Sequence, residues 1–571
     1  MQVDQQYFRG FVLTEEPITG QEIKSLNIGS FILSYSPDLP VTEYQGERHL
    51  ILLGYAVLED ISLKTQDILK MLDTNPNDQQ ALLNRMNGRY VLLVWEDELK
   101  IYPDATTMRP VFYHESLPIA ASHSALAAFA AKNHFDAAVE QYAGDINGYL
   151  DYSRYQGIYK LNPNTFLSLN NQKTTRFFPS EDYQVMDTTT ILKETIRYFT
   201  AMRNWLRTQE TYLTITAGID SRVSLAVMHD KTLPLLTYNS TAKLSAFAEQ
   251  AYANDIRIVD EITADLGLNH TLLQIDSNKQ ISEETLQYTQ QFESSHSFSL
   301  SEKMAASDFK GRLHIKSNIF ELAKLPVVTK YYVPNDFSFK EVIKQKKPKA
   351  LNMDPDAMME AYFRRADLTI DKAYGHYLPD LYYQEQRMGN WHSNITQETD
   401  NSVDVFILLN TREMLRLVTS AGLNERKQNV LHREWINHFW PVLNFYPVNE
   451  QENLYALYKE QQCSVEIVGE DVIISGDQVM PKFPLKSTDV SFKLVNKGTE
   501  PCAANIMSHY KNAAAVGTIS LIMEGQSYPY QELTAGKSVV VDADSTMTVT
   551  IQFNKLYDRE SWQKAARLTI K

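Results

Sequence analysis

The hydrophobic pattern changes character twice along the chain. Up to about residue 185, short apolar runs such as Phe31–Tyr35 and His49–Val57 are separated by turn residues, a pattern typical of strands. The apolar stretch over 86–97, followed by a second over 99–104, predicts two strands joined by a tight acidic turn. We therefore expect a mostly antiparallel sheet domain over residues 1–185.

From residue 186 onward, helical and strand-like patterns alternate. Amphipathic segments are interleaved with β-branched and apolar runs over 191–207, 212–216, 233–238, 255–266 and 271–275. Gly267 directly follows the fourth of these segments and predicts a helix stop. The alternation predicts an α/β domain with a parallel sheet and crossover helices over residues 186–462.

Helical patterns largely vanish after residue 462. Segments such as 491–498 and 547–553 alternate apolar and polar residues and are separated by turn residues, which predicts a small β-sandwich over residues 463–571. The expected fold class is therefore multi-domain α+β and α/β. It comprises an antiparallel sheet domain, a parallel-sheet α/β domain and a C-terminal β-sandwich.

Composition narrows the function classes. The net charge of −15 argues against a general nucleic-acid binder, and the short basic run 344–349 is interpreted as a solvated loop. No segment is apolar over the length of a membrane-spanning helix. The first residues lack the basic flank and apolar stretch of a secretory signal, which favours a cytoplasmic location. The two cysteines, Cys463 and Cys502, are too few and too far apart to indicate a metal site or a disulfide framework.

A candidate phosphate-binding loop follows the first strand of the α/β domain. A strand that ends in small residues, turns and opens a helix offers free backbone N–H groups and a positive helix end to an anion. Here Ala217 and Gly218 let the backbone approach that anion, while the hydroxyls of Thr216 and Ser221 can donate to it. Asp220 can hold Mg²⁺ beside the phosphate. The alternative interpretation is a helix entry capped by Asp220 or Ser221.

This loop resembles the Ser-Gly-Gly-x-Asp-Ser signature of the ATP-pyrophosphatase superfamily, and its position resembles that in asparagine synthetase. The resemblance implies ATP and Mg²⁺ as cofactors. The run 235–239 is similar to the family's adenine-contacting strand, which implies nucleotide contacts at Thr237 and Asn239. The run 313–321 resembles the second pyrophosphate and metal motif, with Glu321 as a second Mg²⁺ ligand. Because that motif's glycines are missing, a solvated carboxylate at a helix start is the competing interpretation of Glu321.

Later motifs of the synthetase domain are matched in part. The runs 426–433 and 440–443 resemble the family's late helices and its Leu-Pro segment. Where the family usually has Arg-Pro-Lys, this chain has Tyr446-Pro447-Val448-Asn449, so the usual catalytic lysine is absent from the matching place. Lys427 is the candidate catalytic substitute, and a surface lysine is the alternative. The histidines, including His432 and His438, show no metal-ligand spacing and are interpreted as packing or surface residues.

The first domain resembles a class II glutamine amidotransferase over roughly residues 80–170. The matching landmarks are 87–90, 95–97, Asp104, 109–113 and 121–122. Functional members use an N-terminal Cys as the nucleophile. Here position 2 is Gln2 and no Cys precedes residue 463, so glutaminase activity is excluded by that mechanism and Asp104 and Arg109 are treated as inherited structural residues.

Three functions are carried forward. The leading hypothesis, in which the layout is similar to β-lactam synthetases and lasso-peptide cyclases, is an enzyme: an ATP- and Mg²⁺-dependent amide-forming ligase. It would adenylate a carboxylate substrate and transfer it to an amine on a small molecule, peptide or glycan precursor, and a homodimer is left open. The first alternative is a non-catalytic nucleotide-binding protein. The second is a glycan- or polymer-binding assembly factor whose C-terminal sandwich exposes Tyr528 and Tyr530, although both also suit a turn.

Overall fold

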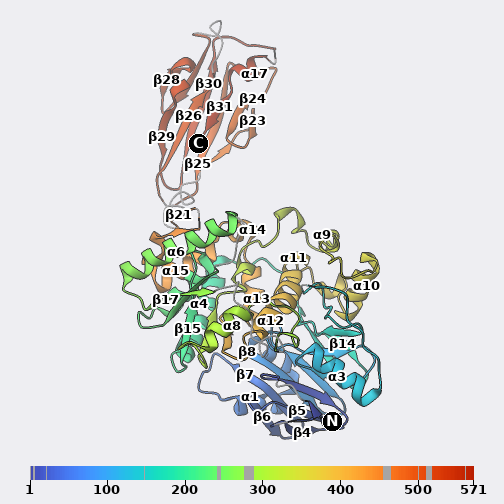
Figure 1. Ribbon diagram of the computed structural model, residues 1–571. Coiled ribbons are helices and arrows are strands. Elements are labelled where there is room, and N and C mark those ends of the chain that lie inside the picture. Colours follow the sequence, from blue (N-terminus) through green and yellow to red (C-terminus); the bar gives the residue numbers. More distant parts are fainter. Residues whose placement is uncertain are drawn as a thin grey trace. The chain divides into compact units, whose positions relative to one another are not determined.

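A computed structural model gives the fold of the chain. It describes residues 1–571 except 1, 4–6, 21, 147, 241–245, 276–287, 450, 454–464, 499, 510–516 and 560. The chain divides into two compact units, residues 1–451 and 452–571 (Figure 1). The predicted boundary at 462/463 lies outside the described residues. Within the described parts of the chain, no helix has the length and apolar character needed to cross a membrane.

The first half of unit 1 contains two antiparallel sheets of six strands each. The first has the order β12 (Ile158–Lys160), β10 (Phe112–His114), β11 (Ala120–Ala121), β2 (Phe11–Thr14), β5 (Phe31–Tyr35) and β4 (Lys24–Ile28). The second has the order β14 (Lys173–Arg176), β13 (Thr165–Ser168), β9 (Leu99–Pro103), β8 (Asn87–Trp95), β7 (His49–Val57) and β6 (Val41–Gln45). The helices of this half are α1 (Thr65–Thr74), α2 (Gln79–Arg85) and α3 (Ser124–Phe135). The predicted antiparallel sheets are confirmed, whereas the domain boundary at 185/186 stays a prediction, because residues 1–451 form one compact unit.

Strand β8 shows why the sequence pattern here is a continuous apolar run. Successive side chains of a strand point to opposite faces of its sheet. Val91 and Leu93 pack into one hydrophobic core, whereas Leu92 and Val94 pack into another, which they share with residues of α1 and α2. Because the strand is buried on both faces, it needs no polar side.

The second half of unit 1 contains a five-stranded parallel sheet. Its order is β17 (His270–Ile275), β16 (Leu235–Ser240), β15 (Thr211–Thr214), β18 (Leu313–Lys316) and β19 (Asp404–Ile407). The first strand in the chain, β15, pairs with β16 on one side and with β18 on the other. The strand order therefore reverses at the carboxyl end of β15, which is where open α/β sheets bind ligands.

This half of unit 1 also contains α-helices. They are α4 (Thr188–Leu206), α5 (Ile219–Met228), α6 (Ala246–Leu266), α8 (Phe298–Ala305), α9 (Lys340–Gln345), α10 (Pro355–Arg365), α11 (Leu378–Tyr382), α12 (Ser393–Gln397), α13 (Arg412–Thr419), α14 (Leu423–Lys427) and α15 (Val430–Phe439), with a π-helix, η5 (Tyr383–His392), between α11 and α12. Helix α6 begins nine residues before the predicted start at 255, and Gly267 ends it in a left-handed conformation, as expected. The basic run 344–349 is a loop only in part, because Lys344 belongs to α9 and pairs with Asp356.

The C-terminal unit is a β-sandwich of two five-stranded sheets, which confirms the predicted class. One sheet has the order β22 (Val465–Val468), β25 (Asp489–Asn496), β30 (Ser545–Phe553), β27 (Ile519–Met523) and β28 (Gln526–Pro529). The other has the order β23 (Val472–Ser475), β24 (Gln478–Pro481), β31 (Leu568–Ile570), β26 (Cys502–Ser508) and β29 (Lys537–Val541). A short helix, α17 (Ser561–Ala565), completes the unit.

Two predictions about this unit are wrong. Tyr530 is fully buried rather than exposed, because its ring belongs to the sandwich core and its hydroxyl donates to the carbonyl of Ala566 at 2.7 Å. Tyr528 is half-buried, with the ammonium of Lys537 lying 5.1 Å from its ring centroid. Cys502 is buried and disulfide-bonded, against the expectation of no disulfide. Cys463 lies outside the described residues.

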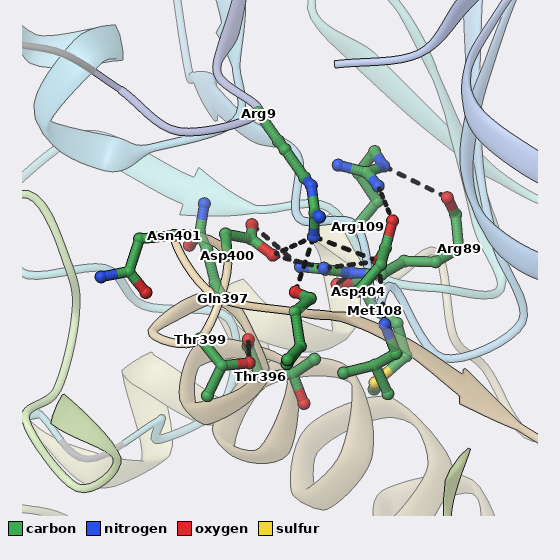
Figure 2. Close-up of polar contacts among 12 residues, drawn as sticks. Arg9, Arg89, Met108, Arg109, Thr396, Gln397, Thr399, Asp400, Asn401 and Asp404 are labelled. Carbon is green, nitrogen blue, oxygen red and sulfur yellow. Dashed lines mark hydrogen bonds and ion pairs between the residues drawn. The ribbon is translucent and has the colours of Figure 1, made fainter. Parts of the chain in front are cut away.

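A buried charge cluster joins the two halves of unit 1 (Figure 2). Arg89 on β8 is fully buried and donates to both Asp400, through two hydrogen bonds, and Asp404, at 3.0 Å. Arg9 reaches the same two carboxylates at 3.5 Å, and Arg109 lies 3.6 Å from Asp404. Burial would raise the pKa of Asp404, but the three guanidinium groups hold it well below its usual range.

Asp104 and Arg109, the predicted inherited residues, have structural partners in this region. The carboxylate of Asp104 accepts hydrogen bonds from the backbone N–H groups of Thr106, Met108 and Arg109, and so fixes the turn that carries Arg109. Burial and the neighbouring charge of Arg89 lower the pKa of Arg109 to about 10. Gln2 lies in β1 (Gln2–Val3), which pairs with β3 (Thr19–Gly20).

We expect Arg89→Met to lower the free energy of unfolding of unit 1 by about 3–5 kcal/mol, because it leaves Asp400 and Asp404 buried without their main cation. Urea unfolding followed by circular dichroism measures this loss. Arg197→Met is the matched control: Arg197 is 60% exposed on α4, and removing its ion pairs should cost about 1 kcal/mol or less. Equal losses in the two variants would contradict a special role for the cluster.

Candidate active site

The loop between β15 and α5 is held by its own hydroxyl groups. Gly218 is the N-cap residue of α5. The hydroxyl of Ser221 accepts a hydrogen bond from the backbone N–H of Thr216 at 3.1 Å and lies 3.2 Å from the Thr216 hydroxyl. Thr216 in turn accepts from the N–H of Gly218 at 3.2 Å. The predicted phosphate donors therefore shape the loop in the absence of a ligand.

A carboxylate lies against this loop. The backbone N–H of Ala217 donates to Oδ1 of Asp255, on α6, at 2.7 Å. Asp255 is half-buried, and burial raises its pKa although the Ala217 hydrogen bond opposes the shift. Because loop N–H groups at a helix N-terminus attract anions, Asp255 occupies a position suited to a phosphate oxygen.

Asp220, in the first turn of α5, has two partners. Lys324 donates to its Oδ2 at 2.7 Å, and Nε2 of the buried His432 lies 3.0 Å from its Oδ1. Burial would raise the pKa of Asp220, but the His432 hydrogen bond and the Lys324 charge hold it below its ordinary value. His432 has a lowered pKa because it is buried, so it is a neutral donor to Asp220 near pH 7.

Glu321 lies near Asp220 but follows a different strand, β18, which pairs with β15 on the side opposite β16. It lies in the 3-10 turn η2 (Phe320–Ala323), just after β18. Ile319 precedes it by two residues with φ +79°, a left-handed conformation that is strained for a β-branched residue. Burial, followed by the charge of Asp220, raises the pKa of Glu321. The structure therefore brings together the two carboxylates that the sequence predicted as a pair.

The two carboxylates fit a divalent cation with few protein ligands. Among the described residues, Oε2 of Glu321 is buried without a hydrogen-bond partner, although the Tyr383 hydroxyl is hydrogen-bonded to the same carboxyl group. No cluster of three or more His, Cys, Asp or Glu residues suited to a metal occurs in the described part of the chain. Mg²⁺ is commonly held by one or two carboxylates together with phosphate oxygens and water, so Asp220 and Glu321 are a sufficient protein contribution.

The remaining predicted site residues lie on β16 and at the end of α14. On β16, Thr237 is buried and donates to the carbonyl of Ile215 at 2.8 Å, while Asn239 is half-buried and pairs in register with Gln274. Nucleotide contacts at Thr237 and Asn239 stay predictions. Lys427 is exposed at the end of α14, and no hydrogen bond or ion pair among the described residues joins it to Asp220.

The segment over 446–449, which has no lysine where the sequence resemblance places one, lies directly beside the loop over 216–221. The N–H of Asn449 donates to the carbonyl of Ala217 at 3.3 Å. The buried guanidinium of Arg222 donates to the carbonyls of Tyr446 and Pro447 at 2.7 and 2.6 Å. The lysine that contacts the site is instead Lys324, from the segment after Glu321.

Four residues of this site escaped the sequence analysis: Lys324, His432, Asp255 and Tyr383. Lys324 was accessible in principle, because it lies three residues after Glu321 in the same motif. His432 is 212 positions from Asp220, so its contact depends on how α15 packs against α5. No local pattern signals such a contact.

Comparison with known proteins leaves the interpretation to this geometry. No family model and no curated protein matches the sequence. Among solved structures, NMN synthetase from Francisella tularensis is 14% identical, covers 42% of this chain and 97% of its own, and has a TM-score of 0.17. A Bacteroides fragilis protein assigned as an alpha-galactosidase is 9% identical, covers 79% of this chain and 95% of its own, and has a TM-score of 0.12. TM-scores this low carry no argument about fold or function.

We expect Mg²⁺ affinity, measured calorimetrically with a non-hydrolysable ATP analogue, to rise with pH through the raised pKa of Glu321 and then to level off. Protonated Glu321 cannot bind the cation, so binding must release its proton. Asp220 stays ionised over this range because its pKa is lowered. Glu321→Gln should bind more weakly and without this pH dependence. A wild-type affinity that stays constant from about pH 5 to about pH 8 would contradict the assignment.

Proposed function

We propose that the chain is an ATP- and Mg²⁺-dependent amide-forming ligase that adenylates a carboxylate and transfers it to an amine. The observation that carries the proposal is the convergence of Asp220 and Glu321 at the carboxyl edge of the parallel sheet, beside a loop at a helix N-terminus. The resemblance of both motifs to asparagine synthetase supports the same reaction class.

Each group of the site has a role in this reaction. Asp220 and Glu321 would hold Mg²⁺, which neutralises charge on the leaving pyrophosphate. Lys324, already paired with Asp220, would supply a second positive charge to that developing anion. Since residues 1–462 contain no cysteine, the amine would come from a second substrate rather than from glutamine. The cytoplasmic location stays a prediction, and the disulfide at Cys502 weighs against it.

A non-catalytic nucleotide-binding protein is the second candidate, and one observation favours it. The anion position at Ala217 is filled by Asp255, and Asp220 is already paired with Lys324. When the polar groups of a site are already hydrogen-bonded or ion-paired within the protein, a bound ligand stabilises them less than it would stabilise unpaired groups. The assembly-factor hypothesis loses its structural basis at Tyr530, which is buried.

ATP-to-pyrophosphate exchange over a panel of carboxylates tests the ligase proposal. We expect exchange in the wild type, and a decrease of at least about a hundredfold in Asp220→Asn and in Lys324→Ala, because both remove charge that faces the leaving group. Lys427→Ala is the matched lysine control and should retain exchange. Nucleotide binding without exchange across the panel would favour the non-catalytic candidate, and loss of exchange in Lys427→Ala alone would restore the sequence-based assignment.

Asp255→Asn should tighten ATP binding by about tenfold or more, a gain of about 1.4 kcal/mol, because the amide oxygen can still accept from Ala217 while the negative charge beside the triphosphate is removed. Equilibrium binding of a fluorescent ATP analogue measures the change. Asp260→Asn, on the exposed side of the same helix, is the control and should have no effect. Weaker binding in Asp255→Asn would show that Asp255 does not compete with phosphate.

A further inference from the structure

A cavity adjoins the carboxylate pair. It has a volume of about 300 Å³, and its lining includes Tyr149, Pro326, Lys346, Tyr383, Arg387 and Trp391. The first of these comes from the antiparallel half of unit 1, and the others from loops and helices of the second half.

Two of its walls are shared with the candidate active site. Tyr383 lines the cavity and is hydrogen-bonded to the carboxyl group of Glu321. Pro326 follows Lys324 by two residues, and Lys324 contacts Asp220. A molecule in this cavity is thus one side chain away from the groups proposed to hold Mg²⁺ and pyrophosphate.

The π-helix η5 presents the cavity side chains as a set. Tyr383, Arg387 and Trp391 are spaced four residues apart along it and all line the cavity. On its other side the helix is anchored to the antiparallel half by the buried ion pair of Glu385 with Arg176, at 2.7 Å. π-Helical segments are rare, and those that occur are often found at functional sites. The position of η5 beside this cavity is consistent with a ligand-binding role.

Gly148 permits the close packing of this wall. It has φ +65°, and a Cβ atom there would lie 2.7 Å from the Cα atom of Trp391. The backbone of the antiparallel half therefore touches the π-helix where only glycine fits.

The cavity combines aromatic walls with cations that have no carboxylate partner in the described part of the chain. The Arg387 guanidinium lies 3.4 Å from the ring centroid of Trp391, and the Lys346 ammonium lies 5.5 Å from that of Tyr382. Within the described residues, neither cation forms an ion pair with a carboxylate. An arginine stacked by its face keeps its N–H edge free for a carboxylate, which it can bind through two parallel hydrogen bonds.

We propose that this cavity binds a carboxylate carried on an apolar or aromatic ring, with the carboxylate at Arg387 and the ring between Tyr149 and Tyr382. The naming of this ligand as the substrate rests on the proposed ligase function, whereas the binding itself does not. Pro326 and Val327 in the lining, together with the two tyrosine rings, give such a ring apolar contacts.

Calorimetric titrations of the full chain without ATP or Mg²⁺ test this inference, with benzoate as the main probe. Acetate, benzamide, aspartate and glucuronate are the comparison probes. We expect benzoate to bind at least about tenfold more tightly than acetate, which lacks the ring, and than benzamide, which lacks the charge. Arg387→Ala should weaken benzoate binding by about tenfold or more, and Arg387→Lys should restore only part of it.

Two exposed cations outside the cavity are the matched controls. Arg364→Ala and Lys349→Ala should leave benzoate affinity unchanged, whereas Lys346→Ala should reduce it. Absence of benzoate binding, equal affinity in Arg387→Ala and the wild type, or tighter binding of aspartate or glucuronate would overturn the inference. If benzoate binds through Arg387 while no carboxylate supports pyrophosphate exchange, the cavity assignment stands and the ligase proposal fails.

Discussion

The guanidinium group of Arg89, buried between Asp400 and Asp404, is the interaction on which the arrangement of unit 1 depends. Two carboxylates that face each other inside a protein need a compensating cation, because an isolated buried charge is far more costly than a paired one. Arg89 belongs to β8 at the centre of one antiparallel sheet, and Asp404 begins β19 of the parallel sheet. The pair therefore fixes β19 against the antiparallel half, and β19 in turn pairs with β18, which leads directly into Glu321. The position of the second candidate metal ligand depends on a charge balance in another part of the structure.

The antiparallel half of unit 1 has a structural role, because it holds the π-helix of the other half. Arg176 binds Glu385, and Lys160 donates to Asn394 at 2.7 Å just beyond the π-helix. Burial lowers the pKa of Lys160 well below its usual value, which is consistent with its position in a polar but water-poor contact. These contacts hold η5 in one place, so that Tyr383 reaches Glu321 and Arg387 faces the adjoining cavity. The antiparallel half thus orients a helix of the neighbouring half.

The sequence predicts what is local and misses what depends on packing. Strands such as β7 and β8 could be predicted because their apolar runs are long and bounded by turns, and the loop at Gly218 because strand, small residues and helix follow one another directly. That Asp220 and Glu321 lie near each other was predicted from the loop over 216–221 and the run over 313–321 taken together. By contrast, no capping residue in the sequence marks the start of α6. The residues around Tyr530 likewise do not predict that its side chain is buried. His432 and the π-helix depend on contacts between segments far apart in the chain, which no single-sequence pattern encodes.

Most polar groups of the site already have partners within the protein, and this has a consequence for binding. Asp220 is balanced by Lys324, and the N–H group of Ala217 is satisfied by Asp255. A triphosphate that enters with Mg²⁺ would replace the Asp255 carboxylate by a phosphate oxygen and would share Asp220 between Lys324 and the metal. Binding is then an exchange of one set of charge contacts for another, so its free energy is a difference between two favourable states. Glu321 would gain a partner on binding, because its buried Oε2 has no hydrogen-bond partner among the described residues and its raised pKa reflects a burial that disfavours its unpaired charge. Glu321 is therefore the residue whose interactions depend most on a bound metal, more than those of the loop over 216–221.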